Sequence, residues 1–149
     1  MLTAFKTGGS LATPAARAAD NALKNYSATI LATNPQGVPD ALVSSSFTAG
    51  SSGNDFNPPG SAVNVRYLID RLCAVSGDET SIAAADACRV AGNPVPAGTS
   101  LSNLKGADRT INGAKGAAAQ AILYRVSIKV SGPRNTQSFF QSTFTVPST

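Results

Sequence analysis

Two alternating runs near the C-terminus constrain the fold more than any other feature of this chain. Apolar residues recur at every second position over 121–131, and the same period returns over 136–146. Alternation of this kind is typical of β-strands. The residues between the two runs are of types typical of turns; they are Gly132, Pro133, Arg134 and Asn135. The segment therefore predicts an antiparallel hairpin with strands over Ala121–Ser131 and Thr136–Val146.

A third strand is predicted upstream of this hairpin. From Ala62 to Leu72, apolar residues occupy alternate positions, which is the period of a half-buried strand. A shorter run over Ala41–Phe47 is a candidate for a fourth strand. We therefore expect a sheet of three or four antiparallel strands.

The N-terminal part of the chain predicts a helix from Ala15 to about Leu31. Thr13 and Pro14 suit its start, because a capping hydroxyl is followed by proline in the first turn. Small and apolar residues then recur at helical spacing. The side expected to face water carries Arg17, Asp20, Lys24 and Asn25. The helix should end before Asn34-Pro35, because a residue before proline avoids the α region.

A helix followed by strands favours an α+β fold, with the helix packed on one face of an antiparallel sheet. At 149 residues the chain fits one domain. Residues 1–33 would hold the helix, and residues 62–149 would hold the sheet. Residues 34–61 are predicted to form a long loop, because Pro, Gly and Asn recur in them. Long irregular segments of this kind often form functional surfaces.

The chain contains two cysteines, Cys73 and Cys88. An even pair at this separation is compatible with one disulfide, which would constrain the unfolded chain by about 3 kcal/mol. The alternative is two buried thiols in a reducing compartment. Only 13% of residues are charged, and Ser, Thr, Asn and Gln supply the polarity instead. This composition is typical of secreted and surface proteins, and therefore favours the disulfide.

Histidine is absent, which removes the commonest general base and the commonest metal ligand. A Ser-His-Asp triad cannot be built, and two cysteines are too few for the usual zinc sites. No glycine-rich phosphate motif follows a predicted strand. The adjacent carboxylates Asp78 and Glu79 are predicted to lie in a solvated turn. The sequence therefore predicts no catalytic residue, no cofactor and no metal, and favours a protein that is not an enzyme.

The formal net charge is +4 and the pI is near 9.4. Nucleic acid is nevertheless a disfavoured partner, because the Lys and Arg residues are scattered singly and no aromatic side chains are interleaved with them. Lys105 and Arg109 lie in a stretch predicted to be loop. Together with the turn residues 132–135, they are the candidates for an interaction surface.

No segment reaches the roughly 18–20 continuous apolar residues of a membrane span. Residues Met1 to Lys6 do not form a charged-then-apolar signal peptide either. We interpret the beginning of this sequence as a point inside a longer protein, with the export element missing.

Two stretches of the chain resemble PilX-type minor pilins of β-proteobacterial type IV pili. The first is Asn64-Val-Arg-Tyr-Leu-Ile-Asp-Arg-Leu-Cys73, followed by Cys88. The second is Tyr124-Arg-Val-Ser-Ile-Lys-Val-Ser-Gly-Pro-Arg-Asn-Thr136, followed by Phe139-Phe-Gln-Ser142. Residues 4–26 resemble the region directly after the pilin membrane helix. Residues 34–61 and 90–118 match no family pattern, as expected of variable loops.

The resemblance implies a pilin-like soluble head. Residues 1–33 would be the C-terminal half of the pilin helix, and Cys73 and Cys88 would form the disulfide. A hydrophobic N-terminal helix would anchor the full-length form in the inner membrane. The head would lie in the periplasm before assembly and in the extracellular pilus afterwards.

The implied function is that of a non-enzymatic structural subunit. It would join other minor pilins, of the PilV, PilW and FimU/PilE kinds, and prime pilus assembly at the tip with a PilY-type protein. A second hypothesis is a surface binding module, an adhesin or a DNA-uptake pilin, that uses the basic loop residues Lys105, Arg109 and Lys115. Salt-sensitive binding to DNA would support the second hypothesis.

Overall fold

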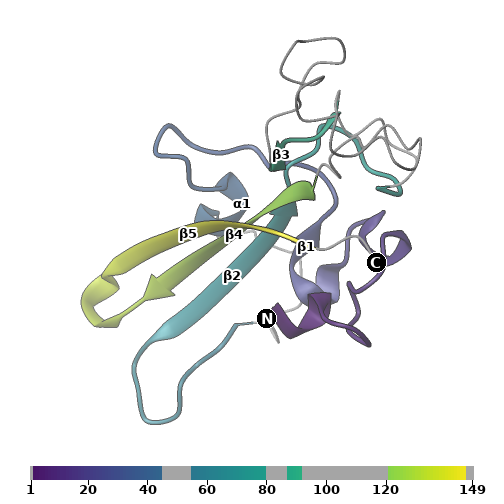
Figure 1. Cartoon of the computed structure of the whole chain (residues 1–149). Helices are drawn as coiled ribbons and strands as arrows, with labels where there is room; N and C mark the ends of the chain where they lie inside the picture. The colour runs from purple at the N-terminus through teal and green to yellow at the C-terminus, as the bar shows by residue number, and fades with distance from the viewer. Residues whose placement is uncertain (1, 45–54, 80–86, 92–120, 147–149) are drawn as a thin grey trace, which may run out of the picture.

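A mixed β-sheet forms the centre of the structure, which is a computed structural model (Figure 1). The structure describes residues 2–44, 55–79, 87–91 and 121–146. Four strands lie side by side in the order β1 (Tyr26–Ser27), β2 (Asn64–Arg71), β4 (Ala121–Ser131) and β5 (Gln137–Thr145). β1 runs parallel to β2, and the other neighbours are antiparallel. The chain is a small α+β-like domain, although its sheet is mixed and not purely antiparallel.

The predicted hairpin is confirmed as β4 and β5, which pair from Leu123 with Thr145 to Ser131 with Gln137. Its turn is the 3-10 helix η6 (Pro133–Asn135), in which Arg134 and Asn135 adopt left-handed φ angles of 59° and 61°. A Cβ at position 132, at the entrance to the turn, would lie 2.7 Å from Thr136 Oγ1, so a larger residue there would displace the Thr136 side chain. The predicted strand over 62–72 is confirmed as β2.

The short strand β3 (Val90–Ala91) pairs with the first two residues of β4. The Leu72 N–H donates to the Leu123 carbonyl, and the Leu123 N–H donates to the Arg89 carbonyl, each at 2.9 Å. Both backbone groups of a strand residue point to the same neighbour in an antiparallel pair. β3 therefore pairs with β4 on the same side as β2, beyond the point where β2 ends at Arg71.

The predicted helix over 15–31 is wrong. The described N-terminal segment forms three short 3-10 helices, η1 (Leu2–Phe5), η2 (Ala15–Arg17) and η3 (Ala22–Lys24), before it enters β1. The predicted start is retained, since Thr13 Oγ1 accepts a hydrogen bond from the Ala16 N–H at 3.2 Å. The expected pilin-like packing of an N-terminal helix on the sheet is not present among the described residues.

Contacts between residues distant in sequence override the helical spacing. Asn25 adopts a left-handed φ of 49°, which ends η3. Its side-chain amide donates to the Tyr67 carbonyl, and its own carbonyl accepts from the Ile69 N–H, so Tyr26 is delivered to the sheet. The alanines of the expected apolar stripe offer little area to bury, and three of them stay exposed: Ala15, Ala19 and Ala22. Tertiary packing wins over local propensity here.

The candidate strand over 41–47 is wrong in its described part. Asp40–Val43 forms the single helical turn α1, and residues 45–47 lie outside the described residues. An acidic side chain in the first turn favours a helix N-terminus, and Asp40 supplies one. The turn buries Leu42 completely, whereas a strand there would need a partner for its backbone. The predicted loop 34–61 therefore contains a helical turn that packs on the sheet.

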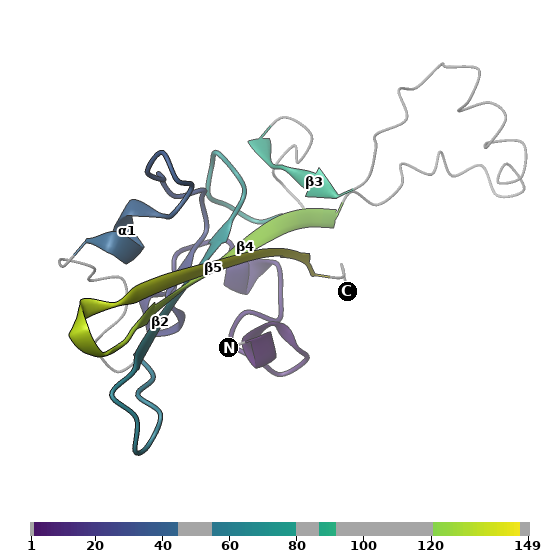
Figure 2. The ribbon, with the colours of Figure 1, turned by 90° about the vertical axis from the view of Figure 1, so that its left-hand side faces the viewer.

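The two faces of the sheet carry different layers (Figure 2). The N-terminal segment covers one face and forms the core with it; the buried residues are Leu11, Tyr26, Ala28, Ile69, Cys73, Ile122, Tyr124 and Val126. Phe5 packs edge-to-face on the rings of Tyr26, Tyr124 and Phe144 at centroid distances of 6.2, 5.4 and 5.3 Å. α1 and the turn before it lie on the opposite face. The half of the core face nearest the hairpin turn is only partly covered.

Candidate interaction surface

β5 lies at the edge of the sheet, and within the described residues it pairs only with β4. The direction of its backbone groups follows from β2, where the Ile69 N–H points to β1. The direction of the backbone N–H and C=O groups alternates along a strand, so those of Asp70 point to β4. The backbone groups of its partner Arg125 point back to β2, and those of Tyr124 therefore point to β5. The backbone groups of Phe144, paired with Tyr124, therefore point inward. Outward-pointing N–H and C=O groups belong to Gln137, Phe139, Gln141, Thr143 and Thr145.

This outer row, which we call the β5 edge, lacks the usual protection of an exposed strand. Natural edges carry charged residues, proline or a bulge that discourages pairing with another chain. Gln137–Thr145 contains neither a charged residue nor proline. The strand is exposed except at Phe144, and the side chains of Phe139 and Phe140 are 38% and 60% exposed. An uncharged strand of nine residues is a ready template for strand addition.

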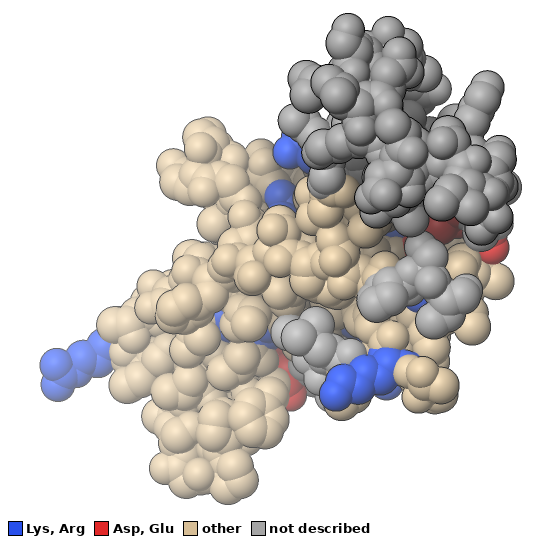
Figure 3. All heavy atoms as spheres, in the orientation of Figure 1, with Lys and Arg blue, Asp and Glu red and all other residues tan. Residues whose placement is uncertain are grey.

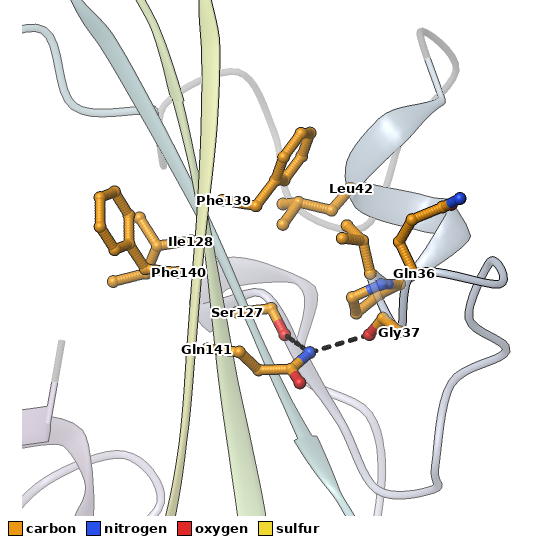
Figure 4. A pocket seen from close by; sticks show the side chains of 10 residues that line it. Gln36, Gly37, Leu42, Ser127, Ile128, Phe139, Phe140 and Gln141 are labelled. Carbon is orange, nitrogen blue, oxygen red and sulfur yellow. Dashed lines mark hydrogen bonds between the residues drawn. The ribbon is translucent and has the colours of Figure 1, made fainter.

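A hollow of about 170 Å³ lies beside the β5 edge, on the α1 face of the sheet (Figure 4). Gln141 forms its floor, because its Nε2 donates to the Gly37 carbonyl and to Ser127 Oγ, both at 3.0 Å. Phe139 and Leu42 lie on its apolar side, whereas Phe140 points to the other face of the sheet. Small-molecule sites typically measure about 300–1,000 Å³. The hollow is therefore suited to one side chain of a bound segment and is too small for a typical cofactor.

The six residues predicted to form an interaction surface are only partly described. Gly132, Pro133, Arg134 and Asn135 lie together at the tip of the hairpin, where the last three are exposed. Lys105 and Arg109 lie outside the described residues. Phe140 and the core residue Phe144 lie on the same face of the sheet, because they are four positions apart on one strand. Phe144 and Ile128 both pack against the core cluster, whereas Phe140, which pairs with Ile128, remains 60% exposed.

A buried charged cluster joins the N-terminal segment to the sheet. Glu79 accepts two hydrogen bonds from Arg17, at 2.7 and 2.8 Å, and one from the Tyr124 hydroxyl. Arg17 also donates to the carbonyls of Leu11 and Ala12. Burial opposes the charge of Glu79, but these hydrogen bonds outweigh it and hold the pKa of the carboxyl below its ordinary value. The carboxylate of Glu79 is thus held by other side chains of the protein, and the prediction of a solvated turn is wrong for this residue.

This cluster has the residue types of a catalytic site, but its arginine side chains are not accessible from solvent. Arg17 and Arg71 are 1% and 0% exposed, and Arg71 donates to the carbonyls of Ala28, Gly77 and Val75. Burial raises the pKa of Tyr124 well above its ordinary value, so its hydroxyl stays protonated. Every buried side-chain nitrogen or oxygen in the described part has a hydrogen-bond partner. The prediction that Arg17 and Asn25 face water is also wrong, because both are buried.

The predicted disulfide is present between Cys73 and Cys88. It closes a ring of residues that includes Glu79, and Cys73 is completely buried in the core. The bridge therefore fixes the segment that supplies the partner of Arg17, which gives it a structural role.

Other kinds of site find little support among the described residues. They contain no group of three or more His, Cys, Asp or Glu side chains that could hold a metal ion. The Lys and Arg side chains on the described part of one face lie in small separate groups (Figure 3). Among the described residues, the helices do not have the length and hydropathy of a membrane span. No family model matches the sequence, and no curated protein or solved structure is significantly similar to it.

Proposed function

We propose that this chain is a non-enzymatic structural subunit that acts by binding other protein chains. The observation that carries the proposal is the β5 edge, which is long, uncharged and exposed, with Phe139 and Phe140 beside it. Strand addition to such an edge supplies main-chain hydrogen bonds, and side-chain pockets add specificity. The hollow between Leu42 and Phe139 is a pocket of suitable size for one side chain.

The finer proposal is a minor pilin of the PilX type. It is supported by the amino-acid sequence and the order of residues 64–73 and 124–136, and by the disulfide between Cys73 and Cys88. In this proposal the chain joins minor pilins of the PilV, PilW and FimU/PilE kinds, with a PilY-type protein at the tip. The full-length form would be anchored in the inner membrane with a periplasmic head, and would enter the extracellular pilus on assembly.

The proposal is tested by capture of purified minor pilins of these three kinds on the immobilised chain. Thr143→Pro removes one outward N–H, which an edge strand tolerates because that group has no partner in the ladder. Thr143→Ser keeps the N–H and serves as the matched control. We expect the serine variant to capture partners as the original chain does, and the proline variant to lose at least about tenfold in affinity. Equal capture by both variants would contradict the role of the β5 edge, and no capture by the original chain would contradict the subunit proposal.

A further inference from the structure

The sequence of the strand is compatible with its own copy as the occupant of the β5 edge. Gln137–Thr145 contains no charged residue, so no like charges meet when the strand is laid beside its own copy. The outward residues have odd numbers, and an antiparallel copy centred on Gln141 places odd residues opposite odd residues. In this register Gln141 faces Gln141, Phe139 faces Thr143 and Gln137 faces Thr145. Every outward N–H and C=O of the strand then has a partner.

We propose that the β5 edge binds the β5 edge of a second copy of this chain, antiparallel, about a two-fold axis at Gln141. This inference rests on the proposed function, since it uses the same surface, and the second copy would compete there with the minor pilins. A two-fold interface uses the same patch on both copies, and this strand is self-complementary in that sense.

The position of Phe140 is the second observation in favour of this pairing. Phe140 is 60% exposed on the core face of the sheet, where it pairs with Ile128. In the two-fold register it faces Ser142 of the second copy, and the two Phe140 side chains become diagonal neighbours across the axis. Diagonal neighbours in a sheet lie about 7–8 Å apart, which aromatic side chains span. The pairing therefore covers the most exposed aromatic side chain of the strand with its own counterpart.

The net charge of +4 does not oppose this arrangement at physiological salt. The basic tip of the hairpin, with Arg134, lies beyond Gln137 at one end of the strand. Antiparallel pairing about Gln141 places the two Gln137 residues eight positions apart, or about 27 Å at the rise of a strand. Charges at that distance are screened, because the Debye length is about 8 Å. A parallel arrangement would bring both basic tips together.

Charge substitutions at the axis test the occupant and the register together. Gln141→Lys places two lysines opposite one another, Gln141→Glu places two glutamates, and an equimolar mixture places a lysine opposite a glutamate. Gln137→Lys and Gln137→Glu are matched controls, because residue 137 faces Thr145 in this register. The readout is sedimentation equilibrium from about 10 µM to about 1 mM, the range suited to a small interface. Thermal unfolding of each variant checks that the fold is retained after Gln141 loses its contacts with Gly37 and Ser127.

We expect the original chain and both Gln137 variants to dimerise. Each Gln141 variant alone should bind itself at least about tenfold more weakly, and the mixture should recover dimers. Amide exchange gives an independent readout, since the outward amides of Phe139, Gln141 and Thr143 should gain protection as the concentration rises.

Two results would overturn the inference. A chain that stays monomeric up to the highest concentration has no self-pairing edge, and Gln141 variants that dimerise like the original chain rule out this register. If that monomer still captures minor pilins in a manner that Thr143→Pro abolishes, the proposed function stands and only the second copy is excluded. If the original chain neither dimerises nor captures a partner, both proposals fail.

Discussion

At the scale of single residues, Glu79 holds the most demanding position. Its carboxylate neutralises a region that contains the buried guanidinium groups of Arg17 and Arg71. Removing one partner of a buried ion pair leaves the other charge uncompensated. The free-energy cost of that unpaired charge exceeds the stabilisation that the pair contributed. This role could not be predicted from the sequence, because Glu79 follows Asp78 in a segment that has the composition of an exposed turn.

Glu79→Gln should lower the free energy of unfolding by about 3 kcal/mol near neutral pH. The folded-state pKa of Glu79 is depressed, so its stabilisation is present above the unfolded pKa of about 4.3 and is lost as the pH falls through the folded pKa. Urea unfolding between about pH 3 and about pH 7, a range that includes the unfolded pKa, measures this pH dependence of stability. The difference between the original chain and the variant should shrink at the acid end. A difference that is constant with pH would mean that the carboxylate charge is not the cause.

Phe140 and Phe144 form a matched pair on one strand. Phe144 stacks on Tyr124 at a centroid distance of 5.5 Å and packs against the core, whereas Phe140 is largely exposed. Phe144→Ser should destabilise the fold by about 2–3 kcal/mol, and Phe140→Ser should change stability by less than about 0.5 kcal/mol. Chemical denaturation measures both values. A loss of about 2 kcal/mol or more for Phe140→Ser would mean that Phe140 belongs to the core.

At the scale of elements, the disulfide ring joins the sheet to the N-terminal segment. Cys73 follows β2, Cys88 precedes β3, and the ring between them carries Glu79. The bridge spans a sequence separation of 15 residues. Its stabilisation arises mainly from the constraint that it places on the unfolded chain.

Replacement of both cysteines, Cys73→Ser with Cys88→Ser, should lower the free energy of unfolding by about 3 kcal/mol. Thermal unfolding of the original chain with and without reductant provides the same comparison without substitution. A thiol assay on unreduced, denatured protein is the control, and two free thiols would contradict the bridge itself.

The sequence predicted those elements whose signal is local and strong. The strands of residues 62–72, 121–131 and 136–146 were found because alternation and turn residues agree there. The helix over 15–31 was not a correct prediction, because the left-handed Asn25 and its bonds to β2 depend on residues more than 40 positions away. The hollow was missed for a similar reason, since Gly37 and Gln141 meet only in three dimensions.

At the scale of the whole molecule, the proposed contacts separate by their response to salt. Self-pairing of β5 is made of backbone bonds and aromatic contacts, with the basic tips far apart. Its dissociation constant should change by less than about threefold between 50 and 500 mM salt, because the charges are already screened at that distance. DNA binding through basic loops would weaken by orders of magnitude over the same range. Sedimentation and fluorescence anisotropy at matched salt concentrations compare the two, and a steep loss of dimer with salt would contradict the antiparallel arrangement.

The bond between Arg17 and Glu79 spans 62 positions, and it has a consequence for the order in which the molecule is made. Residues 2–17 are synthesised before the carboxylate and the sheet face that hold them. This segment is therefore expected to dock last, after the cysteines have joined. Pulsed hydrogen exchange during oxidative refolding would reveal this as late protection of the Leu11 amide, after that of Ile69. Until then, the core face of the sheet lacks the segment that covers it.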